Sequence, residues 1–325
     1  MIITTNQKKI KEALSVAEKI VSRNLALPIL QNIVLKTENG RLKISSTNLE
    51  IGINYWVGAK IEEDGDLAIP ARIFTDFVNS VTGEKITIHT KENIASINAE
   101  NYKTKIIGFS AKDFPIIPKN KNTAFVSVRA KELVDLFSMV VDSAAVSEVR
   151  PELAGVFVRF YASKIEGAAT DSFRLAEKVV AYNGTADYSI IIPKTTVQEL
   201  IRALGDKSED VSLSISDNQI FFTTGDIEIV SRLIDGHYPD YKKVIPDKYL
   251  SKLITNREEL EKSVRVASIF TSNMADIKIQ ADKEGLKILP ERKIGSFGEI
   301  FYTHYDEIEN KFDKCAKVIK SSKPL

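Results

Sequence analysis

The sequence predicts an α+β fold made of three tandem copies of one domain, and two observations lead to this prediction. The first is an internal repeat, because landmarks recur at spacings of 121–124 residues. Ile69-Pro70 returns as Ile192-Pro193, and Phe114-Pro115 returns as Tyr238-Pro239. The second is the pattern inside a copy, where two amphipathic helical stretches are combined with runs of short strands. Each copy is therefore expected to place two helices over a sheet.

The length of the period sets the expected domain boundaries. A period near 122 residues exceeds the roughly 20–50 residues of a solenoid repeat and matches the size of a whole domain. We expect domain one at residues 1–120, domain two at 121–246 and domain three at 247–325. The third copy holds only 79 residues. We therefore expect it to be truncated and to lack its last three strands.

Copy one begins with a predicted helix in which Ile10, Leu14, Ala17 and Ile20 recur at helical spacing after the candidate N-cap Asn6. Its predicted strands are residues 33–36, 42–45, 51–57, 59–61, 85–89, 94–98 and 103–109. A hairpin turn is expected at residues 38–40, which read Glu-Asn-Gly. A second helix begins at Pro70, since proline suits the first helical turn.

Copies two and three are expected to follow the same order. Copy two has predicted helices at residues 131–144 and 195–204 and predicted strands at 156–160, 164–168, 211–215, 219–223 and 228–233. Copy three has a predicted helix at residues 257–269, a hairpin from 277–279 and 286–288, and a second helix at 306–319.

Composition excludes several classes of protein. No apolar run approaches the ~20 residues that a membrane span needs, and the N-terminus lacks the apolar core of a signal peptide. The single cysteine, Cys315, excludes an internal disulfide framework and predicts a cytoplasmic location. The net charge of +1 argues against a protein that coats nucleic acid with its whole surface.

Motifs for catalysis or for binding a metal or cofactor are absent from the sequence. The three histidines are far apart, so we expect no metal site, and no phosphate-binding glycine loop appears. We therefore expect no cofactor. Asp171, Ser172 and His237 could be combined into a hydrolase triad. The alternative that we prefer is that Asp171 and Ser172 are turn residues before a strand.

Three features stand out, and for each both a functional and a purely structural role are open. Residues 170–176 break the internal repeat, although an ordinary strand entry would also fit. Residues 235–241 are aromatic and proline-containing, which also fits a packed corner between domains. Basic residues gather on the first helix of each copy, where a solvated helix face and a shared anionic partner are both open. These residues are Lys8, Lys9, Lys11, Lys19, Arg23, Arg129, Lys131, Arg257, Lys262 and Arg265.

Several segments resemble the bacterial β sliding clamp family, the processivity subunit of DNA polymerase III. They include SRNLALPILQNIVLK at residues 22–36, AATDSFRLAEK at 168–178 and SRLIDGHYPDYKKVIP at 231–246. The resemblance covers residues 1–246 nearly end to end and fades after Ile288. It implies the DNA clamp fold and a non-catalytic protein that is not an enzyme.

The resemblance also implies an assembly and partners. Two chains would pair head to tail into a ring that encircles double-stranded DNA, with helices lining the hole. The homodimer would tether the DNA polymerase III catalytic subunit, the clamp loader and other proteins that carry a clamp-binding motif. It implies no membrane partner.

Site residues carry over from the family position by position. The family's partner-peptide pocket, between its second and third domains, corresponds here to Leu153, Thr170, Ser172, Phe173, Arg174, Leu175, Pro239, Lys243 and Val244. Expected DNA contacts are Arg23, Asn24 and Arg150. Expected dimer contacts are Ile106, Ile269 and Phe270. Phe173 departs from a commonly polar position, and we expect the family's C-terminal strand, which forms the far wall of the pocket, to be absent.

Two alternatives to a closed clamp stay open from the sequence. The first is a clamp-like peptide-binding module that no longer closes a ring, and the short third copy motivates it. With a short third copy, we expect a weaker dimer than in a full-length relative. The second alternative is the hydrolase that would use Asp171, Ser172 and His237.

Overall fold

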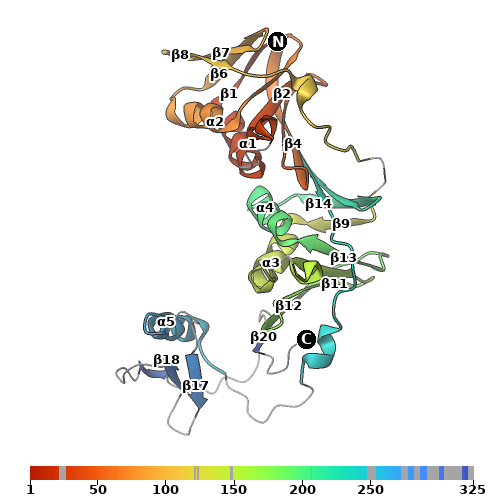
Figure 1. Cartoon of the computed structure of the whole chain (residues 1–325), viewed down its shortest axis with the longest axis vertical. Coiled ribbons are helices and arrows are strands. Elements are labelled where there is room, and N and C mark those ends of the chain that lie inside the picture. Colours follow the sequence, from red (N-terminus) through yellow and green to blue (C-terminus); the bar gives the residue numbers. More distant parts are fainter. Residues whose placement is uncertain are drawn as a thin grey trace. The chain divides into compact units, whose positions relative to one another are not determined.

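The structure of the chain is a computed structural model (Figure 1). It describes residues 1–21, 27–120, 122, 124–146, 149–205, 207–246, 254–271, 277–281, 286–290, 300–303 and 317–320. The chain forms two compact units. The first consists of Met1–Val244 and Ala316–Leu325, and the second of Ile245–Cys315.

Copy one is an antiparallel sheet with two helices. Its elements are β1 (Ile2–Asn6), α1 (Gln7–Ile20), the 3-10 turn η1 (Pro28–Gln31), β2 (Asn32–Glu38), β3 (Arg41–Thr47), β4 (Ile51–Glu63), β5 (Asp66–Pro70), α2 (Ala71–Ser80), β6 (Lys85–Lys91), β7 (Ile94–Ala99), β8 (Tyr102–Ile107) and η2 (Ala111–Asp113). The side chain of Asn6 accepts a hydrogen bond from the Lys9 amide at 3.2 Å, which confirms the predicted N-cap. Asn39 and Gly40 both have positive φ between β2 and β3, which confirms the predicted tight hairpin.

One strand of copy one is longer than predicted. Residues 51–57 and 59–61 were expected to be separate strands, but β4 runs without a break from Ile51 to Glu63. The first half of β4 pairs with β3, and the second half pairs with β1. Neighbours on the sheet therefore hold the strand through Gly58, where local sequence alone suggests a break.

Copy two repeats this order of elements. They are β9 (Val126–Arg129), α3 (Ala130–Val140), η3 (Val141–Ser143), η4 (Pro151–Leu153), β10 (Gly155–Phe160), β11 (Lys164–Thr170), β12 (Arg174–Ala181), β13 (Tyr188–Pro193), α4 (Lys194–Leu204), β14 (Asp210–Ser216), β15 (Gln219–Thr224), β16 (Ile227–Arg232) and η5 (Tyr241–Val244). The predicted helices and hairpins of this copy are confirmed, although α3 ends at Val140 and continues as a 3-10 turn.

Strand pairing joins the two copies into one sheet. The last strand of copy two, β16, pairs antiparallel with β4 of copy one, with Val230 opposite Gly52. In the described residues, this pairing produces a sheet of 12 strands. The Asn54 side-chain amide adds a 3.0 Å hydrogen bond to Glu228 across the same junction. Copy one and copy two therefore belong to one compact unit.

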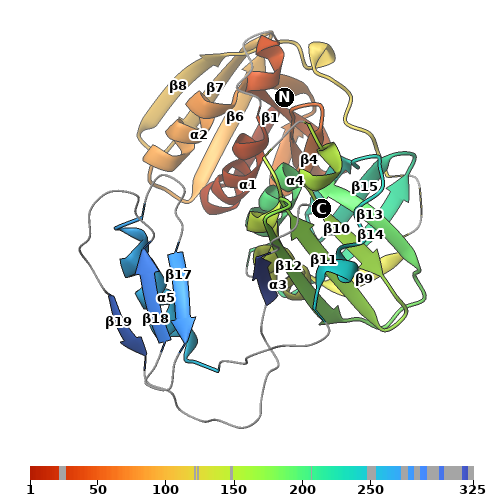
Figure 2. The ribbon, with the colours of Figure 1, turned by 60° about the horizontal axis from the view of Figure 1, so that its bottom comes forward.

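The helices of this unit form one contiguous layer. Helix α1 contacts α2 and α4, and α4 contacts α3, as both views show (Figures 1 and 2). Each helix turns an apolar face to the sheets, as Leu14 of α1, Phe74 of α2, Phe137 of α3 and Leu200 of α4 illustrate. A single hydrophobic core runs through both copies. Burial of these faces supplies the main stabilisation of the unit.

The third copy contributes a smaller group of elements. In the described residues these are α5 (Arg257–Ser268), β17 (Ile277–Ala281), β18 (Leu286–Pro290) and β19 (Ile300–Thr303), and the three strands pair in that order. The first predicted helix and the hairpin are confirmed. Ala267, Leu286 and Ile288 form their own buried cluster.

The end of the chain differs from the prediction. A helix was expected at residues 306–319, but residues 317–320 form strand β20 (Lys317–Lys320), which pairs with β12 in the first unit. Residues 306–316 lie outside the described residues. The free edge of β12 offers a row of backbone donors and acceptors, and pairing with that edge decides the conformation of a four-residue segment more strongly than its local sequence does.

Candidate functional site

A tight turn between β11 and β12 is the centre of the candidate site. Thr170 Oγ1 donates to the Arg174 carbonyl at 2.8 Å and accepts from the Ser172 amide at 3.1 Å. Asp171 Oδ1 accepts from the amides of Phe173 and Arg174 at 3.0 and 2.9 Å. Ser172 has a φ of 75°, a left-handed conformation that this bonding supports. The interpretation of Asp171 and Ser172 as turn residues is thus confirmed.

Asp171 is held as a carboxylate by its surroundings. Burial by itself raises the pKa of Asp171, but the two backbone amides and the Arg174 guanidinium outweigh burial and hold the pKa below its usual range. Arg174 Nε donates to Asp171 Oδ2 at 3.0 Å, and Arg174 Nη2 donates to the Asp142 carbonyl at 2.9 Å. The turn is therefore connected to η3, the 3-10 turn that follows α3, and Arg174 is held by two bonds.

The turn brings five of the nine predicted pocket residues together. Thr170 and Leu175 are 1 % and 3 % exposed, whereas Phe173 is 74 % exposed. Leu153 is also buried, in η4, and its carbonyl accepts from the Ala145 amide at 2.9 Å. The described part of the site thus has a buried apolar floor and one large exposed aromatic ring beside it.

The remaining three predicted residues, Pro239, Lys243 and Val244, come from the segment after β16. Tyr238 in this segment stacks on Phe157 of β10 with ring centroids 5.0 Å apart, and Tyr241 meets the same ring edge-on at 6.3 Å. Burial raises the pKa of both tyrosine hydroxyls. The segment is therefore packed against the sheet of copy two, whereas the alternative weighed from the sequence was a packed corner between domains.

Strand β20 is a strand near the C-terminal end, where a helix and no further strand were expected from the sequence. It lies antiparallel to the start of β12, with Lys320 opposite Arg174 and Ile319 opposite Leu175. The strand therefore runs beside the turn that carries Phe173. Sequence reasoning missed it because KVIK contains only two apolar residues, too few for a periodic signal.

The hydrolase alternative has no support in the geometry. Among the described hydrogen bonds, none joins Ser172 to His237, and the side chain of Asp171 is committed to the turn and to Arg174. Within the described residues, no group of three or more His, Cys, Asp and Glu is placed to hold a metal ion. No helix in the described part of the chain is long and apolar enough to cross a membrane.

The predicted DNA contacts fall partly outside the described residues, because Arg23 and Asn24 are not among them. Arg150 is described, and its Nε lies 3.1 Å from Glu152 Oε1. The basic residues of the first helices are most concentrated on α1, where Lys8, Lys9 and Lys11 are all exposed. Both α1 and α5 also carry acidic residues among their basic ones, Glu12 and Glu18 in α1 and Glu258, Glu259 and Glu261 in α5.

The predicted dimer residues differ in exposure. Ile106 is 5 % exposed and belongs to the core of copy one, whereas its neighbour Ile107 in β8 is 74 % exposed. Strand β8 is the last strand of the large sheet in the described residues, so its outer edge is free for pairing. Ile269 and Phe270, just after α5, are 71 % and 39 % exposed. The dimer contact at Ile106 stays a prediction, and alternation along β8 adds the exposed Ile107 as a second candidate on this strand.

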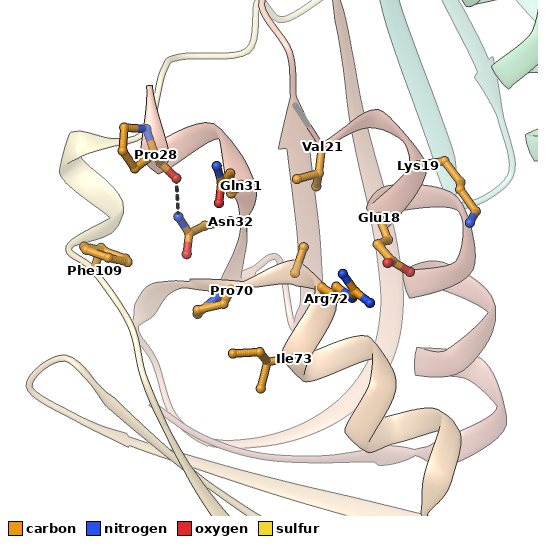
Figure 3. A pocket seen from close by; sticks show the side chains of 11 residues that line it. Glu18, Lys19, Val21, Pro28, Gln31, Asn32, Pro70, Arg72, Ile73 and Phe109 are labelled. Carbon is orange, nitrogen blue, oxygen red and sulfur yellow. Dashed lines mark hydrogen bonds between the residues drawn. The ribbon is translucent and has the colours of Figure 1, made fainter. Parts of the chain in front are cut away.

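A cavity of about 870 Å³ lies in copy one (Figure 3). The end of α1, η1 and the start of α2 surround it. Its lining residues include Glu18, Lys19 and Arg72 as well as Ile73 and Phe109. Asn32 donates from Nδ2 to the Pro28 carbonyl at 3.1 Å and so fixes one wall, as the dashed line in Figure 3 marks.

Comparison with known proteins agrees with this architecture. The family description "DNA polymerase III beta subunit, N-terminal domain" matches residues 1–118, and "DNA polymerase III beta subunit, central domain" matches residues 127–240. The beta sliding clamp of Rickettsia bellii is 25 % identical over 293 residues, which are 88 % of this chain and 77 % of that protein. The beta sliding clamp of Staphylococcus epidermidis is 26 % identical over 261 residues, which are 77 % and 69 % of the two chains.

Solved structures show the same fold. A sliding clamp (DNA polymerase III subunit beta) from Pseudomonas aeruginosa, bound to griselimycin, is 25 % identical with a TM-score of 0.82, covering 89 % of this chain and 79 % of that chain. The DNA polymerase sliding clamp of Bacillus subtilis is 23 % identical with a TM-score of 0.83, covering 99 % and 84 %.

The repeated unit of two helices over a sheet, together with these neighbours, defines a DNA clamp fold. The chain belongs to the DNA polymerase III beta subunit family. It is a sliding clamp, a processivity subunit without catalytic activity of its own.

Proposed function

We propose that two copies of this chain pair head to tail, encircle double-stranded DNA and hold DNA polymerase III on it. The observation that carries this proposal is the joining of copy one to copy two by edge-strand pairing between β4 and β16, with α1–α4 in one layer. A ring needs the same kind of junction to be repeated between chains. Strand β8 offers a free edge for it, with Ile107 exposed.

The DNA would be held mainly by topology. Net charge near zero gives the chain little general affinity for phosphate. The lysines of α1 lie on exposed positions of the helical layer, which we assign to the lining of the hole. Arg23, Asn24 and Arg150 are the further proposed DNA contacts, and Ile269 and Phe270 the proposed contacts of copy three in the dimer.

Partner proteins would bind through short peptides at the turn after β11. Phe173 is exposed, and Thr170, Leu175 and Leu153 are buried. An apolar surface here would accept leucine or phenylalanine anchors, each contributing ~1.5–3 kcal/mol when buried. Ser172, Arg174, Pro239, Lys243 and Val244 complete the proposed pocket. We propose the polymerase catalytic subunit, the clamp loader and other motif-bearing proteins as the partners, and the cytoplasm as the place of action.

The experiment compares retention on closed circular DNA and on the same DNA after linearisation. The chain is loaded, and its release is followed at 50 and 200 mM salt. A protein held by about 6–10 phosphate contacts would lose ~10³–10⁵ in affinity between these salts on either DNA. We expect retention on circles at both salts and rapid loss after linearisation. Equally fast release from both DNAs would refute encirclement and favour a module that closes no ring.

A matched pair of variants tests the edge of β8. Ile107→Asp should abolish dimerisation in sedimentation velocity and, with it, retention on circles. Ile116→Asp places the same charge at a side chain that is 93 % exposed after η2, and it should leave both unchanged. If Ile107→Asp dimerises like the unmodified chain, β8 is not the interface.

A further inference from the structure

A charged cluster in copy two supports an inference that rests on the proposed peptide pocket. The Glu166 cluster consists of Lys164, Glu166, Glu177, Tyr241 and Lys242. Glu166 in β11 is 3 % exposed, and its two carboxylate oxygens are both paired. Oε1 accepts from Lys164 Nζ at 2.6 Å, and Oε2 accepts from Lys242 Nζ at 2.6 Å. A buried carboxylate needs such partners, because removing either leaves a charge poorly compensated.

The Glu166 cluster connects η5 with the strands β11 and β12, and the proposed pocket takes residues from both. Lys242 and Tyr241 belong to η5, next to the proposed pocket residues Lys243 and Val244. Tyr241 Oη donates to Glu177 Oε1 at 2.7 Å, and Lys242 Nζ lies 3.8 Å from the same atom. Glu177 is in β12, two residues after Leu175. The η5 segment is thus attached to both β11 and β12.

We infer that the Lys242–Glu166 ion pair is a positioning contact that holds the η5 wall of the peptide pocket in its binding position before a partner arrives. A wall that is already fixed need not be ordered when the peptide binds, so more of the contact energy appears as affinity. The side chain of Lys242 forms ion pairs with Glu166 and Glu177, which are not proposed pocket residues. Its effect on the pocket is therefore transmitted by the backbone of η5. A partner peptide would meet Lys243 and Val244, which follow it directly.

The other lysine of Glu166 provides a matched control. Lys164 lies in β11 itself, two residues before Glu166, and pairs with the other oxygen of the same carboxylate. Lys164→Gln and Lys242→Gln remove the same charge from the same partner, and the two lysines are 43 % and 50 % exposed. Only Lys242→Gln removes a contact between η5 and β11, and the bond from Tyr241 to Glu177 remains. A merely electrostatic role for the cluster predicts equal effects of the two variants.

The experiment measures affinity by calorimetry for a short synthetic peptide with one leucine and one phenylalanine anchor, using the full chain. We expect Lys242→Gln to weaken binding roughly 3- to 10-fold, Lys164→Gln to leave it within about twofold, and Lys242→Arg to restore it. Amide hydrogen exchange at residues 240–244 should rise in Lys242→Gln alone. Equal affinities of the two glutamine variants, with normal binding by the unmodified chain, would overturn the inference. If the unmodified chain binds no peptide, the proposed pocket fails and the inference falls with it.

Discussion

The turn after β3 in copy one and the turn after β11 in copy two are built by the same hydrogen bonds. Thr47 Oγ1 donates to the Ile51 carbonyl at 2.8 Å, as Thr170 does to Arg174. Asn48 Oδ1 accepts from the amides of residues 50 and 51, as Asp171 does from those of residues 173 and 174. Leu49 and Ser172 have φ angles of 76° and 75°. The repeat therefore preserves this backbone while its side chains differ.

The side chains after the turn make the two surfaces different. In copy one the next strand has Gly52, and Ile117 from the following segment lies so close that its Cγ2 would be 2.8 Å from an added Cβ. In copy two the equivalent position is Leu175, and Phe173 before it is 74 % exposed. In copy one Ile117 thus occupies the space beside Gly52, whereas in copy two the buried Leu175 stands at that position with the exposed Phe173 near it. The comparison teaches that one backbone frame can carry different side chains, and the proposed binding site lies in the copy whose turn carries the exposed phenylalanine.

The largest effect is expected from removing the apolar side chains that copy one lacks. Leu175→Ala and Phe173→Ala should each weaken peptide binding by ~1–3 kcal/mol, or roughly 5- to 150-fold. Leu175 is buried, so its variant should also lower the free energy of unfolding by about 2–5 kcal/mol. The exposed Phe173 should change it by less than about 0.5 kcal/mol. Calorimetry and urea unfolding measure the two quantities.

The counterpart of Phe173 in copy one is Glu50, so Glu50→Ala is the control and should leave peptide affinity unchanged. Unaltered affinity in both copy-two variants would count decisively against the pocket.

A second prediction tests whether Ile117 packs against Gly52, beside the turn of copy one. Gly52→Ala should lower the free energy of unfolding by about 1–3 kcal/mol, because the new methyl group meets Ile117 and Val230 at 2.8 and 3.0 Å. Gly58→Ala in the same strand has nothing within 4 Å of its added methyl group. It should be neutral or stabilising by about 0.4–1 kcal/mol. Equal urea midpoints for the two variants would show that Ile117 does not pack against Gly52.

Local patterns in the sequence predicted most of this architecture because helices and hairpins leave local signals. The N-cap Asn6, the hairpin at Asn39-Gly40 and the first helix of each copy all follow from spacing and turn chemistry. Long-range pairing leaves no such signal. The junction of β4 with β16 and the strand β20 depend on partners far away in the chain, so they emerged only from the structure.

The site was predictable only by likeness to a family and only in part. The turn residues Thr170–Leu175 are indeed brought together, since they are neighbours in sequence. The sequence alone did not establish which face of strand β8 each residue occupies. The structure shows that Ile106 is buried and Ile107 is exposed. The ion pair of Glu166 with Lys242 joins residues 76 positions apart, which no local pattern reveals.

A third prediction exchanges the turn residues between copies. Asn48 shows that an amide oxygen can accept both backbone bonds, so Asp171→Asn should change the free energy of unfolding by only a few tenths of a kcal/mol. Asp171→Ala leaves the amides of Phe173 and Arg174 without that acceptor and should cost about 1 kcal/mol. Both variants lose the bond to Arg174 Nε. Urea unfolding distinguishes them, and equal losses would mean that the ion pair with Arg174, rather than the shared bonding pattern, holds the turn.

The smallest expected effect concerns the lysine–glutamate ion pair that holds the segment following each copy. In copy one Lys119 lies 3.7 Å from Glu38, and in copy two Lys242 lies 2.6 Å from Glu166. Burial by itself raises the pKa of both carboxyls, but neighbouring groups outweigh burial. These groups are Lys43, Trp56 and Lys119 for Glu38, and Lys164 and Lys242 for Glu166. Both pKa values therefore lie below their ordinary value of 4.5. Arg159 lies opposite Glu166 in the pairing of β10 with β11, but its guanidinium forms an ion pair with Asp187.

A lowered folded-state pKa fixes the sign of the pH dependence. Each carboxylate stabilises the fold above the pKa of the unfolded chain and loses that contribution as the pH falls through its folded-state pKa. The difference in free energy of unfolding between the unmodified chain and Glu166→Gln should thus be constant near pH 6–7 and shrink below about pH 4.5. Glu38→Gln should show the same trend with a smaller difference, because Lys119 is 73 % exposed and its contact with Glu38 is longer. Urea unfolding from pH 7 to pH 3 measures both. A difference for Glu166→Gln that stays constant down to pH 3 would mean that its carboxylate is not what fastens η5 to the sheet.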